Sequence, residues 1–405
     1  MQKTIISIFQ KISESYPQTP FAAEFWDGNV KNFGRGPEKF RVIFKSENAI
    51  KRFLSTGSLG SGEEYMAGNI EIAGDIQSAL GLYDSWAKVA GGISLGVKAN
   101  ILLNRVFSLN TIRGAKKNIS WHYDMGNEFY SLWLDPSLTY SCAYFRNESD
   151  DLGTAQSNKY EHICRKLRLE PGESLVDIGC GWGGMMFYAA KNRGAKCVGY
   201  TASKNQYDYI NEKIKNEDWG DSVKVYLDDY RKAKGVFDKF VSIGMFEHVG
   251  KHYQKKFFET AKKILKPKGI GLLHTIGSLA DQPTDPWIAK YIFPGGYIPP
   301  LAMAVDNMNQ ADLAFYDIED LRPHYAKTLD LWAKNFESDI NTIRKIITVK
   351  FRDQNQAKQF IRMWRLYLNA SAVSFKIGAN RLYQILFSNG INNDLPLTRD
   401  YIYRD

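Results

Sequence analysis

The run Val176–Gly184 constrains the fold most, because it has the pattern of a buried strand that ends in a glycine-rich turn and opens a helix. Its first residues are apolar and partly β-branched, as a buried strand requires. Gly179, Gly181 and Gly183 let the backbone turn tightly and approach a ligand closely. A second strand over residues 196–201 completes the spacing of a βαβ unit, which binds ligands at the carboxyl ends of its strands. A turn that needs its glycines only for structure would show the same pattern.

Strand and helix patterns alternate along the second half of the chain. Five apolar stretches after Gly172 have the length and composition of strands: residues 175–178, 197–200, 223–227, 237–243 and 270–274. This alternation predicts a parallel sheet with helices on both faces. Beyond Tyr325 the pattern predicts a long helical region that ends near Phe387. The predicted fold class is therefore α/β, with a doubly wound, Rossmann-like sheet.

The first hundred residues have a different pattern. Residues 40–44 alternate as a strand does, and the glycines of residues 57–62 predict a turn into a helix. We therefore expect a smaller mixed α/β amino-terminal domain over residues 1–100. Basic residues and polar Asn-Ser stretches predict a linker at 101–118, which leaves 119–405 for the second domain.

Composition narrows the class of protein. The 405 residues carry 53 Lys and Arg against 44 Asp and Glu, a formal charge of +9 that favours an anionic partner, either nucleic acid or a lipid headgroup. The same charge also serves plain solubility. No apolar stretch is long enough for a membrane span and no signal-peptide pattern is present, so we expect a cytoplasmic or peripheral membrane protein. The four cysteines lack paired metal-ligand spacing, and we predict no metal site.

Polar residues follow the predicted strands where a ligand is expected. Asp177 ends the first strand, Thr201 and Gln206 follow the second, and Asp228–Arg231 follow the third. Glu247 and His274 stand at the ends of the fourth and fifth. Because parallel strands end at one edge of a sheet, we expect these side chains around one cleft. Taken singly, Glu247 could be a helix-start acid and His274 a core histidine with its hydrogen bonds satisfied.

The chain resembles the cyclopropane fatty acid synthases, a family that includes the mycolic acid cyclopropane synthases. The similar segments run in consistent order from about residue 120 to the end, and residues before 100 resemble, more loosely, the smaller amino-terminal domain of the phospholipid-acting branch. The segments are His122–Asn127, Leu134–Pro136, Thr139–Tyr144, Val176–Gly184, Gly244–Gly250, Leu272–Gly277, Lys290–Gly295 and His324–Trp332. The aspartate two residues before the first glycine is likewise common in S-adenosylmethionine-dependent methyltransferases.

The resemblance implies an activity. A synthase of this family adds the methylene of the S-adenosylmethionine methyl group across a cis double bond of a phospholipid acyl chain. Methyl transfer leaves a carbocation, and a bound bicarbonate ion removes a proton from the new methyl group so that the ring closes. The implied ligands of that ion are the Cys142 and Ile276 amides, Glu247, His274 and Tyr325. An ionised Glu247 would accept the proton of the bicarbonate, since two bare anions would repel one another.

The resemblance also implies cofactor contacts. Tyr123 is expected near the methyl group, where an aromatic face stabilises positive charge; the alternative is that it serves only in packing. The other implied or predicted cofactor residues lie in the glycine turn and at neighbouring strand ends: Tyr140, Ser141, Asp177, Gly179, Cys180, Gly181, Gly183, Thr201, Ala202, Gln206, Tyr230 and Arg231. Ser371 occupies a position where some phospholipid-acting members have a cysteine, and we expect that thiol to be dispensable.

The implied partner is an unsaturated phospholipid in a bilayer, bound peripherally at the inner face of the membrane by a lipid-docking amino-terminal domain. The apolar segment 280–300 contains residues that suit a membrane interface. A homodimer is possible, and no nucleic-acid recognition motif is present. Four alternatives stay open: a lipid C-methyltransferase that leaves a methyl or methylene branch, a small-molecule methyltransferase, a lipid-binding protein without catalysis, and a nucleic-acid methyltransferase, which would explain the charge.

Overall fold

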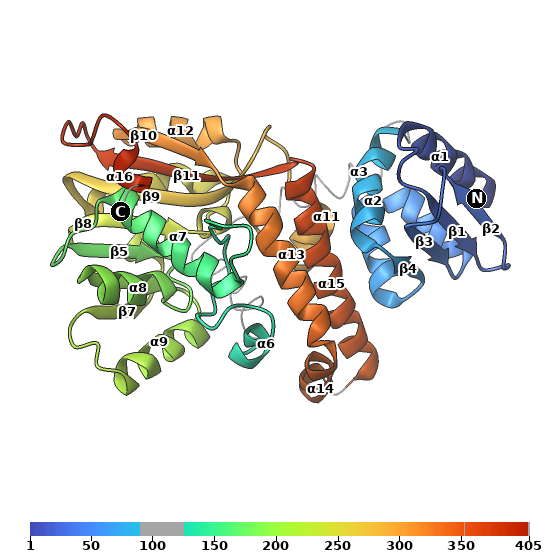
Figure 1. The fold of residues 1–405 in the computed structure, drawn as a ribbon, viewed down its shortest axis with the longest axis horizontal. Coiled ribbons are helices and arrows are strands. Elements are labelled where there is room, and N and C mark those ends of the chain that lie inside the picture. Colours follow the sequence, from blue (N-terminus) through green and yellow to red (C-terminus); the bar gives the residue numbers. More distant parts are fainter. Residues whose placement is uncertain (90–124, 352, 404–405) are drawn as a thin grey trace. The chain divides into compact units, whose positions relative to one another are not determined.

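The computed structural model describes residues 1–89, 125–351 and 353–403. Its described residues form two compact units (Figure 1). Of the described residues, the first unit draws on 1–89, 283–294, 332–351 and 353–377, and the second on 125–282, 295–331 and 378–403. Two segments from late in the chain therefore pack with the amino-terminal residues. The linker at 101–118 lies outside the described residues, and the division into 1–100 and 119–405 stays a prediction.

The first unit contains a four-stranded sheet in the order β2-β1-β3-β4. Its strands are β1 (Phe21–Phe25), β2 (Val30–Phe33), β3 (Phe40–Phe44) and β4 (Ile70–Gly74), and its early helices are α1 (Gln2–Ser15), α2 (Glu47–Ala67) and α3 (Ile76–Val89). The strand predicted at residues 40–44 is confirmed. Stacked phenylalanine rings fill the core: Phe21 lies 4.9 Å from Phe33 and 5.1 Å from Phe40, measured between ring centroids. This small unit thus has an aromatic core of its own.

Segments from later in the chain complete the first unit. They form α11 (Pro286–Tyr291), α14 (Ile340–Phe351) and α15 (Gln354–Lys376). Trp287 of α11 is buried, its ring packs against Gly62, and its indole N–H donates to Met66 Sδ at 3.3 Å. Ile292 is also fully buried. These apolar residues, which the sequence suggested for a membrane interface, are packed inside the protein.

Arg362 of α15 forms hydrogen bonds that hold this helix against α2 and β4 of the first unit. Its guanidinium donates to the carbonyl oxygens of Tyr65 and Ile70 and to the Glu71 carboxylate, at 2.8 Å for the carboxylate and 3.0 Å for Ile70. The same group lies over the Tyr65 ring, 4.2 Å from its centroid. A planar group with several donors suits this combination of stacking and hydrogen bonding, which a lysine could not reproduce.

The second unit is built on a seven-stranded sheet in the order β10-β11-β9-β8-β5-β6-β7. The neighbouring strands from β9 to β7 pair in parallel, whereas β11 pairs antiparallel with β9 and with β10. The strands are β5 (Ser174–Ile178), β6 (Lys196–Thr201), β7 (Val223–Leu227), β8 (Phe237–Ile243), β9 (Leu265–Ser278), β10 (Leu313–Asp320) and β11 (Asn380–Asn389). All five predicted strands are present, and the predicted α/β class is confirmed.

The prediction of a helical region up to Phe387 was wrong at its end. Helix α15 ends at Lys376, and Gly378 adopts a positive φ of 75°, after which β11 begins. Leu382, Ile385 and Phe387 of β11 are all buried. A strand covered on both faces has a nearly continuous apolar sequence, which lacks the alternation that distinguishes a strand from a buried helix.

Helices cover both faces of the large sheet. Apolar residues of α7 (Leu152–Leu167), α8 (Gly184–Arg193) and α9 (Lys204–Asn216) pack with Leu175 on one face. Those of α10 (Gln254–Ile264) and α12 (Leu301–Gln310) pack with the next residue, Val176, on the other face. Successive strand residues point to opposite faces, so the central strand contributes to both cores. The remaining helices are α6 (Asn127–Ser131), α13 (Arg322–Ser338) and α16 (Asp400–Tyr403).

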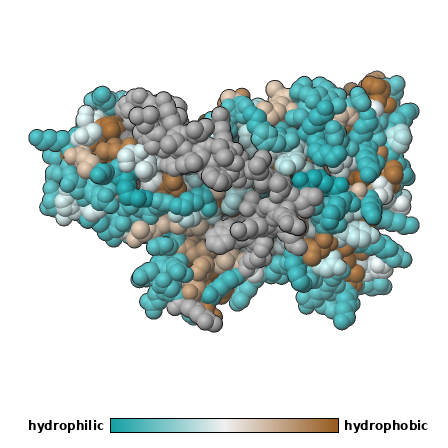
Figure 2. Space-filling model, turned by 180° about the vertical axis from the view of Figure 1, so that it is seen from behind, coloured by the Kyte–Doolittle hydropathy of each residue, from teal (hydrophilic) through white to brown (hydrophobic). Residues whose placement is uncertain are grey.

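The surface is largely polar. Hydrophilic residues cover most of the described surface on the face that Figure 2 shows, and apolar residues lie there in small groups. Among the described residues, no helix has the length and apolar character needed to cross a membrane.

We predict that Arg362→Met destabilises the first unit by about 2–4 kcal/mol, because it leaves two carbonyl oxygens and a carboxylate without their donor. Lys45→Met is a matched control, since Lys45 also pairs with Glu71 but is 54% exposed, and its loss should cost less than ~1 kcal/mol. Differential scanning calorimetry measures both changes. Equal effects of the two substitutions would contradict the role assigned to Arg362.

Candidate active site

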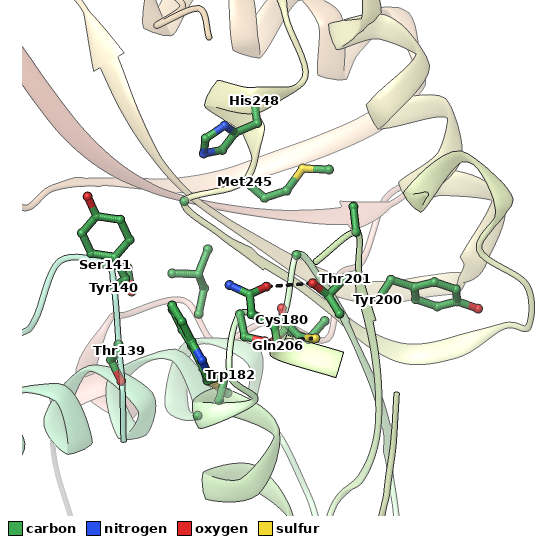
Figure 3. A pocket seen from close by; sticks show the side chains of 18 of the residues that line it. Thr139, Tyr140, Ser141, Cys180, Trp182, Tyr200, Thr201, Gln206, Met245 and His248 are labelled. Carbon is green, nitrogen blue, oxygen red and sulfur yellow. Dashed lines mark hydrogen bonds between the residues drawn. The ribbon is translucent and has the colours of Figure 1, made fainter. Parts of the chain in front are cut away.

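A pocket lies where β5, β6, β7 and β8 end. It is lined by eleven of the twelve predicted cofactor residues: Tyr140, Ser141, Asp177, Gly179, Cys180, Gly181, Thr201, Ala202, Gln206, Tyr230 and Arg231. Gly183 lies outside this lining. The edge of the sheet therefore gathers residues that are up to 91 positions apart in the sequence, from Tyr140 to Arg231, and Figure 3 shows several of them around the pocket.

At two positions of the glycine turn, steric clashes exclude any residue with a side chain. Gly179 has a φ of 83°, and a Cβ there would lie 2.5 Å from the Cβ of Met245. Gly183 precedes α8 with a φ of 84°, and a Cβ there would meet Phe187 and Ile210. Side chains at either position would require both backbone strain and displacement of a neighbour. Gly183 is thus explained by packing, and its contact with a cofactor stays a prediction.

At the end of β6, a hydrogen bond between two side chains fixes the local geometry. The Thr201 hydroxyl donates to Gln206 Oε1 at 2.8 Å, as the dashed line in Figure 3 shows. Ser203 caps α9 by accepting from the Gln206 amide at 3.4 Å. Both side chains of the Thr201–Gln206 pair are buried. Their hydrogen bond fixes the orientation of the Gln206 amide group beside the pocket.

An ion pair between Asp229 and Arg231 follows the end of β7. Asp229 accepts two hydrogen bonds from the Arg231 guanidinium, each at 2.7 Å. The guanidinium carbon lies over the rings of Tyr230 and Tyr253, 5.3 Å and 5.1 Å from their centroids. The bidentate pair and the two aromatic faces hold Arg231 rigidly.

Asp177, at the end of β5, has the chemistry of a ligand-binding carboxylate. It is 2% exposed, and its Oδ1 atom has no hydrogen-bond partner among the residues that the structure describes. Burial raises its pKa to about 7, although the Lys159 ammonium acts against that rise. A buried carboxylate oxygen that lacks a donor is costly, so this atom suits a ligand that brings one.

Glu247 lies four residues after the end of β8, and His274 lies within β9 opposite Ile243, the last residue of β8. The Gly244 amide donates to the His274 carbonyl oxygen at 2.9 Å, which connects the end of β8 to β9. Glu247 Oε1 accepts from the Ile276 amide at 2.5 Å, whereas its Oε2 atom has no hydrogen-bond partner within the described ranges. Burial raises the pKa of Glu247 to about 7. In this arrangement the Ile276 amide holds Glu247, and its predicted contact with an ion stays a prediction.

His274 presents a nitrogen of its own. Its Nδ1 atom lies 3.2 Å from Gln384 Nε2, and with that amide donating, the ring proton sits on Nε2. His274 Nε2 is buried and, like Glu247 Oε2, finds no partner among the described residues. Burial lowers the pKa of His274 well below its ordinary value, so the ring is a neutral donor. His274 Nε2 is therefore a buried donor and Glu247 Oε2 a buried acceptor, and each can form a hydrogen bond with a ligand.

The other predicted catalytic residues approach from outside the sheet. Cys142 is fully buried, and burial raises the pKa of its thiol, which disfavours a thiolate nucleophile. The next amide, of Ala143, donates to Thr328 Oγ1 of α13 at 3.0 Å. Tyr325 is three residues before Thr328 on the same helix and is buried. Tyr123 lies outside the described residues, and its role stays a prediction.

The pocket also contains residues that sequence reasoning did not assign to the cofactor, among them Lys159, Met245 and His248. Lys159 had a detectable signal, because it lies four residues after Ala155 and four before Ile163, two buried apolar residues of α7. A lysine inside the buried stripe of an amphipathic helix is unusual.

Comparison with known proteins agrees with this geometry. The family model described as mycolic acid cyclopropane synthetase matches residues 111–385, and a domain of unknown function, DUF7884, matches residues 8–85. The chain belongs to the mycolic acid cyclopropane synthetase family. Like its relatives, this family member is an enzyme of the S-adenosylmethionine-dependent methyltransferase class, as predicted.

Two relatives of this family member match almost end to end. A probable fatty acid methyltransferase of Pseudomonas putida is 35% identical over 397 residues, covering 95% of this chain and 96% of the relative. The cyclopropane-fatty-acyl-phospholipid synthase of Escherichia coli K12 is 37% identical over 378 residues, covering 90% and 92%. The solved structure of mycolic acid cyclopropane synthase CmaA1 complexed with SAH and CTAB is 32% identical, with a TM-score of 0.62 over 67% of this chain and 98% of that one.

We predict that Glu247→Gln changes how stability depends on pH. The folded protein holds the Glu247 proton up to about pH 7, whereas the ordinary pKa is 4.5, so this group makes the wild type less stable as pH rises through that window. Glutamine lacks that titration. The variant should therefore gain ~3 kcal/mol relative to the wild type between pH 4.5 and pH 8.

Urea unfolding curves of both proteins across this pH range measure the difference. A difference in stability that stays constant with pH would contradict the raised pKa of Glu247.

Proposed function

We propose that this family member is a cyclopropane-fatty-acyl-phospholipid synthase. It would transfer the methylene of the S-adenosylmethionine methyl group to a cis double bond of an unsaturated phospholipid acyl chain. The observation that carries the proposal is the pairing of a pocket lined by cofactor-binding residues with the buried, unpartnered atoms of Glu247 and His274. The near full-length similarity to the Escherichia coli phospholipid synthase supports it.

The residues of the pocket fit S-adenosylmethionine. Asp177 offers a buried acceptor for an ammonium group, and Gln206 offers an oriented amide for ribose hydroxyls. Tyr140 and Trp182 supply aromatic faces, which suit a sulfonium cation. S-adenosylmethionine supplies an electrophilic methyl group when bound. Tyr123 would add a further aromatic face near that methyl group.

The second set of residues fits bicarbonate. Glu247 Oε2 can accept the single proton of that ion, and His274 Nε2–H can donate to one of its other oxygens. The amides of Cys142 and Ile276 and the hydroxyl of Tyr325 would supply further donors. Bicarbonate supplies the base that removes a proton from the new methyl group. Glu247 and His274 orient that base and hold its charge in a site away from water.

The substrate is proposed to be a phospholipid that stays in the bilayer. The formal charge of +9 supports peripheral binding to anionic headgroups at the inner face of the membrane, with each basic residue near the surface contributing about 1 kcal/mol. The amino-terminal residues would form the lipid-docking domain, and the protein would act in the cytoplasm. A homodimer is also part of this proposal, on the resemblance alone.

A second candidate is a lipid C-methyltransferase that leaves a methyl or methylene branch. The similarity to the probable fatty acid methyltransferase of Pseudomonas putida, over 95% of this chain, favours it. A methyl-branched alkene forms when the carbocation loses a proton of the acyl chain, whereas a methylene branch forms after a hydride shift and the loss of a proton of the new methyl group. Because Glu247 and His274 fit a base beside the new methyl group, we favour ring closure over the methyl-branched alkene, and hydrogenation of the product distinguishes the ring from a methylene branch.

The decisive experiment incubates the full-length protein with methyl-labelled S-adenosylmethionine and vesicles of a monounsaturated anionic phospholipid. Acyl methyl esters are then analysed by mass spectrometry before and after mild hydrogenation. A labelled product that resists hydrogenation is expected, because a ring does not take up hydrogen under these conditions. A labelled product that does take up hydrogen would instead indicate a methylene branch or a shifted alkene.

Glu247→Gln should lower the turnover number about 100-fold or more while leaving the affinity for S-adenosylhomocysteine within about threefold. The affinity should be preserved because Glu247 is not among the residues that line the cofactor pocket. Turnover is measured with the vesicle assay and affinity by calorimetry. A parallel loss of both would show that Glu247 shapes the cofactor pocket rather than the proton-transfer site.

Ser371→Cys should leave turnover within about twofold of the wild type. Ser371 lies on α15, where its carbonyl oxygen accepts from the Ser374 hydroxyl at 2.8 Å, and no part of the proposed mechanism uses it. The same vesicle assay measures the rate. A large gain in rate would mean that a thiol at this position takes part in the chemistry.

A further inference from the structure

One face of α7 supports the loop that carries Tyr140 and Ser141. Gln156 Nε2 donates to the Ser141 carbonyl oxygen at 2.9 Å, and Lys159 Nζ donates to the Ser141 hydroxyl oxygen at 2.9 Å. The Tyr160 hydroxyl lies 2.5 Å from Thr139 Oγ1. Residues three and four positions apart lie on the same face of a helix. A single helix face therefore sets the position of this part of the pocket wall.

Lys159 is the unusual member of that face. Its side chain is fully buried, lines the pocket and lies with Nζ 4.5 Å from the centroid of the Tyr160 ring. The hydrogen-bond acceptor that it contacts, Ser141, is neutral. A buried ammonium without a carboxylate at hydrogen-bonding distance is costly. Burial lowers the pKa of Lys159 to about 7, although Asp135 and Asp177 act against that effect.

The charges around Lys159 leave it available to a ligand. Asp135 is engaged with its own loop, where it accepts from the amides of Ser137 and Thr139 at 2.9 Å and 3.0 Å. Asp177 has its Oδ1 atom without a partner among the described residues. The other cation in the described pocket lining, Arg231, is paired with Asp229. The pocket thus has one buried cation and one buried carboxylate, each with capacity for a further polar partner.

Lys159 and Asp177 both line the pocket, and each shifts the pKa of the other, which places them at the same end of it. Asp177 ends β5, whereas the Asp229–Arg231 pair follows β7, and β6 lies between the two strands. Two strand spacings separate the ends of β5 and β7 by about 10 Å. One end of the pocket therefore offers a cation with a carboxylate, and the other end offers a closed ion pair flanked by aromatic rings. A ligand with a zwitterionic end and an aromatic end matches both.

We propose that Lys159 is a cofactor-binding residue that receives the α-carboxylate of S-adenosylmethionine and of its product, while Asp177 accepts from the α-ammonium. This inference rests on the proposed function, because it assigns a residue to that cofactor. The Ser141 hydroxyl holds the Lys159 ammonium, and Gln156 holds the Ser141 backbone that forms this part of the pocket wall. The bound carboxylate completes the charge balance that the buried lysine lacks in the protein alone.

Calorimetry with two nucleosides tests this assignment in the full-length protein. S-adenosylhomocysteine carries the α-carboxylate, and its decarboxylated analogue keeps the ammonium but lacks that carboxylate. We expect the wild type to bind the former about 10–100-fold more tightly. Lys159→Met keeps the length of the side chain and removes its charge, so it should lose most of its affinity for S-adenosylhomocysteine and change that for the analogue less than about threefold.

Ser141→Ala is the matched control, because it removes the hydroxyl that Lys159 contacts and keeps the ammonium. It should retain the preference for the carboxylate. Should Lys159→Met fail to fold, as judged by near-ultraviolet circular dichroism, Lys159→Gln takes its place. Equal weakening of both nucleosides by the lysine variant would overturn the proposal and leave Lys159 as a residue that only positions the loop. If the wild type bound neither nucleoside, the proposed function itself would be contradicted.

Discussion

The parallel pairing of β5 with β6 and β8, and of β6 with β7, brings four strand ends to a single edge, and the candidate site depends on that arrangement. Backbone hydrogen bonds fix the strands, and the glycine turn after β5 lets Met245 and the end of β8 approach closely. Glu247 is held by the Ile276 amide of β9, and the His274 carbonyl oxygen of the same strand accepts from the Gly244 amide that follows β8. Residues distant in sequence are thereby positioned by the sheet itself.

The site departs from ordinary core packing in its buried polar atoms. Asp177 Oδ1, Glu247 Oε2 and His274 Nε2 are buried without partners among the described residues, and Lys159 is a buried cation beside a neutral hydroxyl. Each such group costs folding free energy. The burial of Glu247 and Asp177 also raises both pKa values to about 7, close to the pH at which a proton acceptor or a cofactor ligand works. Burial of these polar groups thus both lowers the stability of the fold and shifts the pKa values toward those that the chemistry needs.

Local patterns predicted the parts of the structure that depend on local constraints. The five strands around the glycine turn and the pocket residues near it follow from apolar runs and from the rule that ligands bind at strand ends. Strand β11 was missed because it is buried on both faces and follows a 23-residue helix, although Gly378 marks the break. Lys159 was missed because lysines on helices are usually exposed. The packing of α11 and α15 with the amino-terminal strands depends on tertiary contacts such as those of Arg362 and Trp287.

The central claim is that a base acts beside the newly transferred methyl group. The most direct test uses S-adenosylmethionine with a trideuterated methyl group and counts the deuterium atoms in the lipid product by mass spectrometry. If Glu247 and His274 orient a base toward that methyl group, the product retains two of the three deuterium atoms. Retention of all three would mean that the carbocation loses a proton elsewhere, and it would contradict the assignment of this buried pair.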